Sequence, residues 1–199
     1  MPAPLEIMVG PAEVWVAPPG TEFPKIDAAP TGNWSLIGTL GSQNYGENGV
    51  IIRFSRTTNS IRVAGATTPR KHIITETGFQ VEFTVIDATP EQLALGFGLD
   101  PDDIDEVAAG VGTAGEQSFG LPDDPVPFAR AVLVRVPQSP LMEGGNTQIE
   151  IPMANQVGNA EGSFAKADAF QLTHIWDAVK TDQPIAIFRV QSAAAQSGD

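Results

Sequence analysis

Apolar and polar residues alternate in many short segments of this chain, and Gly, Pro, Asn and Asp separate the segments. Such period-two alternation predicts strands with one buried face and one solvated face. The clearest case is QVEFTVID, in which Val81, Phe83 and Val85 occupy the predicted buried face. The predicted strands are residues 12–16, 34–40, 50–56, 60–64, 71–76, 79–87, 128–136, 148–153, 162–169, 172–178 and 185–190.

One short helix is predicted directly after the strand that contains Val85. Thr89 is a typical N-cap, Pro90 suits the first helical position, and Gln92 stands where a capping box needs it. One of two glycines, Gly96 or Gly98, can end the helix in a left-handed turn. A helix of two turns is unstable alone in water, so it must pack on the sheet.

These elements predict a mainly β, sandwich-like or barrel-like fold with one short α-helix at about residues 90–97 and long loops. We expect residues 1–199 to form one domain with a flexible N-terminal arm. The tail at about 191–199 is expected to be frayed. The Gly- and Pro-rich segment at about 100–127 begins with a possible helical turn capped by Asp100 and is otherwise expected to be a long acidic loop.

The amino-acid composition argues against several functional classes of protein. The 199 residues include no cysteine, which excludes disulfides, thiolate metal sites and cysteine nucleophiles and permits a reducing compartment. The formal net charge of −13 argues against a protein that grips nucleic-acid phosphates. No signal peptide and no apolar run long enough for a membrane span is apparent, so we expect a soluble protein without membrane insertion.

Two motifs resemble ligand sites but lack the required context. GVGTAG, residues 110–115, matches a dinucleotide fingerprint, yet no helical pattern follows it, which favours a flexible loop. DPDDIDE, from Asp100 to Glu106, fails the register of a calcium-binding EF-hand, because Ile104 stands at the fifth place of the loop, which needs a ligand, and Asp105 at the sixth, which needs Gly. A capped, solvated turn is therefore favoured over a calcium site.

Catalytic signatures are also weak. The two histidines, His72 and His174, are far apart in sequence and have no partner motif, which favours ordinary strand residues over metal ligands. No serine nucleophile motif occurs, and no spacing among the carboxylates identifies a glycosidase pair. We therefore predict no enzymatic activity, no cofactor and no metal requirement.

Charge is distributed unevenly along the chain. One short span is basic, whereas the segment from 100 to 124 contains eight acids and no Lys or Arg. These spans are either two solvated surfaces or two halves of a contact between identical subunits. The basic residues are Arg53, Arg56, Arg62, Arg70 and Lys71, and the acids are Asp100, Asp102, Asp103, Asp105, Glu106, Glu116, Asp123 and Asp124.

The order of several stretches resembles the major tail tube proteins of long-tailed, siphovirus-like bacteriophages. These stretches are WSLIGTL, GENGVIIRFSRTTNSIRV, TTPRKHIIT, GFQVEFTVIDATPEQLALGFG and IPMANQVGNAEGSFAKADAFQLTHIWDAV. They extend over most of residues 34–190, and their order carries the likeness more than any single motif. The acidic segment between residues 96 and 127 departs from the shortest members of that family.

The resemblance implies a structural virion protein that assembles in the cytoplasm of a bacterial host. Subunits would form hexameric rings, and the stacked rings would form the tail tube through which DNA is ejected without specific binding. Partners would be other copies of the chain and the tape measure, tail terminator and tail tip proteins. The helix would cover the apolar side of the sheet, and Gln80, Glu82 and Thr84 would face the lumen.

In such a tube, a basic lumen would retain DNA through counterion release. We therefore hypothesise that the basic residues lie at subunit or ring interfaces, where they meet the acids of residues 100–124 in a neighbour. Two alternatives stay open: a related tube or connector subunit, such as a secretion-system tube or tail completion protein, and a β-sandwich module that binds carbohydrate or calcium. Rings or tubes in electron micrographs would favour the first two classes, and monomers the last.

Overall fold

The computed structural model describes residues 11–62, 64–65, 67–87, 89–124, 126–137, 146–158 and 169–191. Residues 1–10 of the expected N-terminal arm lie outside the described residues, as do residues 192–199 of the expected tail. The predicted strand over 162–169 also falls outside them, apart from its last residue.

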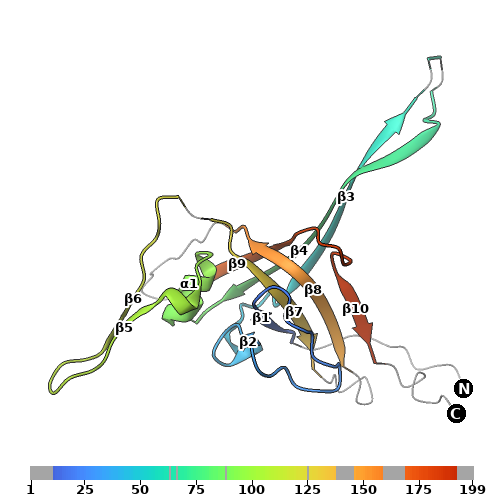
Figure 1. Cartoon of the computed structure of the whole chain (residues 1–199). Coiled ribbons are helices and arrows are strands. Elements are labelled where there is room, and N and C mark those ends of the chain that lie inside the picture. Colours follow the sequence, from blue (N-terminus) through green and yellow to red (C-terminus); the bar gives the residue numbers. More distant parts are fainter. Residues whose placement is uncertain are drawn as a thin grey trace, which may run out of the picture.

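The described chain is mainly β, with far more residues in strands than in helices, which confirms the predicted fold class (Figure 1). All strand pairs are antiparallel. The elements are β1 (Glu13–Ala17), β2 (Ser35–Leu36), η1 (Gly41–Asn44), β3 (Ile51–Ile61), β4 (Lys71–Val85), α1 (Pro90–Gly96), η2 (Pro101–Asp103), β5 (Asp105–Val107), β6 (Glu116–Ser118), β7 (Ala129–Val136), β8 (Thr147–Gln156), β9 (Leu172–Ala178) and β10 (Ile187–Val190).

The main sheet has eight strands, seven of them in the order β2-β1-β7-β8-β9-β4-β3, while β10 pairs with β8. The sheet curves so that strands from its two halves enclose one apolar core. Val14 of β1, Val81 of β4, Ile149 of β8 and Trp176 of β9 all belong to that core. The alternation read from QVEFTVID is confirmed, because Val81, Phe83 and Val85 are buried.

Strands β7 and β8 are also covered on their outer face. The segment between β1 and β2 lies there, and its Phe23 and Trp34 pack with Ala131 and Leu133 of β7. Because both faces are covered, the middle of β7 is buried without alternation. Polar residues on the outer face of these strands are therefore enclosed rather than solvated.

The helix α1 agrees closely with the prediction. The Thr89 hydroxyl accepts a hydrogen bond from the Gln92 N–H, and Gly98 follows the helix with a φ of 74°. The proposed capping box is wrong in one respect, because the Gln92 side chain accepts instead from the N–H of Gly38 at 2.9 Å. The helix is thereby tied to the loop after β2, and Leu95 enters the core.

Four predicted strands are in fact two long ones. Segments 50–56 and 60–64 form the single strand β3, and 71–76 and 79–87 form β4, with one register irregularity between Thr57 and Thr58. The sequence predicts gaps between these strands at residues 57–59 and 77–78. Instead, the pairing between β3 and β4 continues through these residues. Gly78 also allows a close approach of the two strands, because a Cβ there would lie only 2.8 Å from the Ser55 hydroxyl.

Two further boundaries differ from the sequence-based expectation. The strand predicted over 34–40 is limited to β2, because Gly38 and Gly41 adopt positive φ angles and the chain turns into η1. The segment 100–127 is not a structureless loop. It contains η2 and the hairpin β5–β6, which forms a two-stranded sheet of its own.

Candidate assembly surfaces

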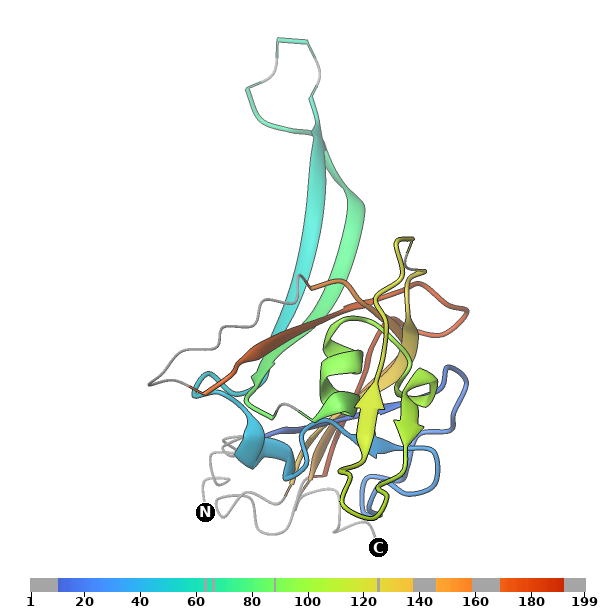
Figure 2. The same cartoon turned by 90° about the vertical axis from the view of Figure 1, so that its left-hand side faces the viewer.

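The β3–β4 hairpin extends far beyond the sheet (Figures 1 and 2). Strand β4 pairs with β9 only from Gln80 onward, so residues 54–79 pair with one another alone. We call this part of the hairpin the arm. Its Ile, Phe and Thr residues favour extended backbone. Side-chain hydrogen bonds reinforce the pairing, including Ser60 Oγ to His72 Nδ1 at 3.0 Å and Thr75 Oγ1 to the Thr57 carbonyl at 3.2 Å.

The arm has no core of its own. Every described residue from Phe54 to Ile61 and from Lys71 to Thr77 is exposed. Large apolar side chains on it remain in solvent, with exposed fractions of 51% for Phe54, 45% for Ile61, 42% for Ile73 and 54% for Ile74. A two-stranded ribbon is at best marginally stable alone in water, so the arm requires a covering surface.

Strand β3 is also the last strand of the sheet. In the described part of the chain, no strand pairs with its outer edge. A long free edge with exposed apolar side chains is the kind of surface to which another polypeptide pairs. The outer edge of β3, from Ile51 to Ile61, therefore offers backbone groups for pairing with another chain.

All five predicted basic contact residues lie on or beside the arm and are exposed. Arg53, at the base, forms an ion pair with Glu82 in the same subunit. The Arg56 guanidinium lies 4.6 Å from the centre of the Phe54 ring. Arg62, Arg70 and Lys71 lie toward the tip, and none of them forms an ion pair within the described residues.

The predicted acidic contact residues lie on the other side of the molecule. Asp100 is partly buried and binds Arg130, with an N–O distance of 2.6 Å, so one acid is already neutralised within the chain. Glu106 and Glu116 lie on β5 and β6. The remaining acids are all exposed: Asp102, Asp103, Asp105, Asp123 and Asp124.

Gln80, Glu82 and Thr84 lie on the face of β4 opposite the core, as the alternation predicts, and each is partly exposed. Thr84 shares this face with Thr173 of β9, and their hydroxyl oxygens are 3.2 Å apart. Arg53 lies on the same face, because its guanidinium forms an ion pair with the Glu82 carboxylate. The sequence reading assigned these two residues to different surfaces, whereas the structure brings them together.

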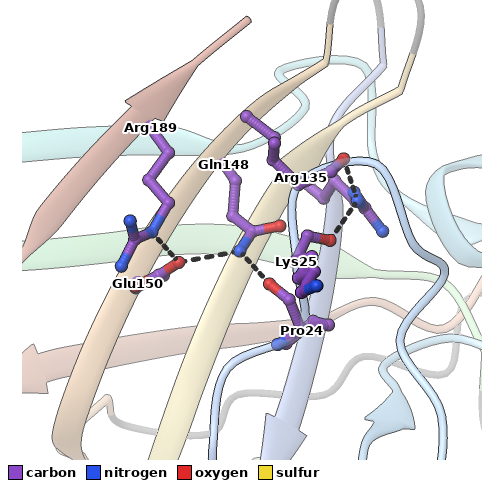
Figure 3. A network of polar contacts seen from close by, with 7 residues as sticks. Pro24, Lys25, Arg135, Gln148, Glu150 and Arg189 are labelled. Carbon is purple, nitrogen blue, oxygen red and sulfur yellow. Dashed lines mark hydrogen bonds and ion pairs between the residues drawn. The ribbon is translucent and has the colours of Figure 1, made fainter.

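The outer face of β7 and β8 contains a buried polar network that sequence analysis missed (Figure 3). Gln148 donates from its amide to Glu150 and to the Pro24 carbonyl, each at 2.8 Å, and Arg189 binds Glu150 at 2.5 Å. Arg135 donates to the carbonyls of Lys25, Ile26 and Ala28. These side chains hold the β1–β2 segment on the sheet, which is a structural role.

The candidate chemical motifs do not converge on a reactive site in the described chain. GVGTAG forms the turn of the β5–β6 hairpin, with Gly112 at a φ of 75°, so no helix N-terminus follows it. His72 lies on the arm and His174 is buried in the core, and no group of three or more His, Asp or Glu residues able to hold a metal is found among the described residues. Likewise, no helix in the described regions has the length and apolarity to cross a membrane.

Comparison with known proteins does not assign the chain to a family. No family model matches the chain, and no curated protein matches it with significant similarity.

Proposed function

We propose that this chain is a structural subunit that self-assembles into stacked rings forming a tube, as in the tail of a long-tailed bacteriophage. The observation that carries the proposal is the arm, whose large apolar side chains Phe54, Ile61, Ile73 and Ile74 are left exposed by the described residues. Contacts with other copies would bury these side chains, each contributing roughly 1.5–3 kcal/mol at full burial.

The hexameric ring, the role in DNA ejection and the virion location come from the sequence resemblance and are part of the same proposal. In that arrangement the polar face with Gln80, Glu82 and Thr84 lines the channel. Arg53 on this face forms an ion pair with Glu82, so this part of the channel wall would offer few unpaired cations to the phosphates of passing DNA. Tape measure, terminator and tip proteins would be its further partners.

The test is electron microscopy and sedimentation of the purified protein over a range of concentrations. We expect rings or tubes from the natural chain. An arm-shortened variant, in which Asn-Gly directly connects Thr57 to Glu76, is expected to fold cooperatively with a β-type far-UV spectrum, because these two residues pair across the hairpin, and to remain monomeric. Monomers alone from the natural chain, at high concentration and with tail tips added as seeds, would contradict the proposal.

A further inference from the structure

We propose that the arm of one copy docks on the β5–β6 hairpin of a second copy, so that the copies associate head to tail. This inference rests on the proposed function and identifies the surface that covers the arm. It combines three observations: opposite charge, exposed apolar side chains on both elements, and a hollow on the hairpin.

The two elements have complementary charge. Residues 54–79 include four basic residues, Arg56, Arg62, Arg70 and Lys71, against the single acid Glu76. Residues 100–124 include eight acids and no Lys or Arg. Of these eight, only Asp100 forms an ion pair within the described residues. Opposite potentials of this kind direct two copies toward one orientation.

The elements also complement each other in apolar surface. The hairpin and its flank expose Val107 and Leu121, each 62% exposed, in the midst of the acids. The arm exposes Ile61, Ile73 and Ile74 beside Lys71. Contact between the two would remove apolar surface from water while pairing the surrounding charges. Neither element has a core that could do this within one subunit.

A hollow of about 400 Å³ lies between the start of α1 and the β5–β6 hairpin. Glu106 and Glu116 line it together with Val107 and Ala109. Strand register pairs Val107 with Glu116, so the Glu116 side chain lies on the same face as Val107. A carboxylate beside an apolar side chain suits Lys or Arg, because the methylene stem packs on the apolar group while the cationic head pairs with the acid. The arm residues assigned to this contact are Lys71, the first residue of β4, and Arg70, which directly precedes it.

The arm and the hairpin cannot meet within one molecule. The arm and the β5–β6 hairpin extend away from the sheet in different directions, the arm to the upper right and the hairpin to the lower left (Figure 1). Each copy therefore presents one arm and one hairpin to different neighbours. Such a heterologous contact generates closed rings or open filaments rather than simple two-fold dimers.

Charge reversal with mixing tests the pairing. One variant carries Arg70→Glu and Lys71→Glu, and the other carries Glu106→Lys and Glu116→Lys. Each variant alone places like charges in the contact, and we expect the concentration for half-assembly, measured by sedimentation, to rise at least about tenfold. An equimolar mixture restores opposite charges in every contact, so assembly is expected to return.

The matched control is Glu22→Lys with Asp182→Lys, which changes charge equally at two exposed acids outside the hairpin and is expected to assemble normally. If the natural chain assembles and the reversed variants assemble equally well, the docking is overturned while the proposed function stands. Failure of the mixture to restore assembly also overturns the docking. Failure of the natural chain itself to assemble is the separate outcome that counts against the proposed function.

Discussion

His174 lies in the core on β9, with its ring stacked on Phe83 at a centroid distance of 5.1 Å. Neither ring nitrogen has a hydrogen-bond partner within the described structure, so a charged imidazolium there would be unpaired. Burial therefore lowers the pKa of His174 to about 4, from an ordinary value of 6.5. The sequence predicted only that His174 is an ordinary strand residue, whereas its burial without hydrogen-bond partners depends on the surrounding core.

This pKa predicts acid destabilisation. The unfolded chain binds a proton at His174 below about pH 6.5 and the folded chain only near pH 4, so stability falls as pH decreases between these values. Between pH 7 and pH 5 the expected loss from this residue is roughly 2 kcal/mol. Urea unfolding of the natural chain and of His174→Phe at both pH values measures it. Equal losses in both proteins would show that other groups cause the acid sensitivity.

Arg135 and Gln148 illustrate the limit of residue-level prediction. Both belong to strands whose pattern was interpreted as one dry and one wet face, yet both are buried because the segment between β1 and β2 covers them. No local signal shows which outer face a distant segment will cover. The backbone carbonyls that accept their hydrogen bonds belong to residues more than a hundred positions earlier in the chain. The burial of both side chains therefore depends on where that distant segment packs.

Replacing Arg135 with Met is expected to destabilise the fold by roughly 2–4 kcal/mol, because the carbonyls of Lys25, Ile26 and Ala28 lose their donor. Thermal or urea unfolding measures the change. The matched control is Lys25→Met, which keeps the backbone acceptor and removes only an exposed side chain, with an expected change under about 0.5 kcal/mol. Similar losses in the two variants would argue against a tethering role.

At the level of elements, α1 was the most accurately predicted feature. Its cap, its Pro and its short length are local signals, and Thr89, Pro90 and Gly98 behave as their chemistry requires. Gly96 is different. A Cβ at this helix residue would lie 2.1 Å from Leu172 Cδ2, so the glycine is needed for close packing on β9 rather than to end the helix.

The substitution Gly96→Ala therefore tests whether helix propensity or packing has the larger effect on the free energy of unfolding. Propensity alone favours Ala by about 1 kcal/mol, whereas overpacking a buried site typically costs about 1–3 kcal/mol. Because Leu172 is fully buried and cannot move away freely, we expect net destabilisation in urea unfolding. Glu91→Ala in the same helix is exposed and serves as the neutral control. A more stable Gly96→Ala protein would show that the contact relaxes easily.

The arm shows why strand boundaries were wrong. Turn-forming residues in TTN and TETG are local signals for breaks, but pairing between β3 and β4 continues through them, with the Thr57–Thr58 irregularity taking up the mismatch. Cross-strand contacts determine strand length, and these depend on register rather than on single residues. The same reason explains the hairpin β5–β6 within a segment that was predicted to be a loop.

At the scale of the whole molecule, the arm and the acidic hairpin project in opposite directions. Assembly driven by these charges should weaken with salt, since screening shortens from about 30 Å at 0.01 M to about 3 Å at 1 M. We expect the concentration for half-assembly to rise between 0.05 M and 0.5 M sodium chloride. Sedimentation at matched protein concentration measures it. Unchanged or stronger assembly at high salt would indicate that apolar contacts dominate.

The alternation of Val81, Phe83 and Val85, the Thr89 cap of α1 and the position of Gly98 are set by neighbouring residues, and the sequence predicts them correctly. Periodicity and capping depend on side chains only a few positions apart. The coverage of the outer face of β7 and β8, the length of the arm and the separation of the two charged elements were decided by tertiary structure. They depend on strand register and on contacts between distant segments, which local pattern does not encode.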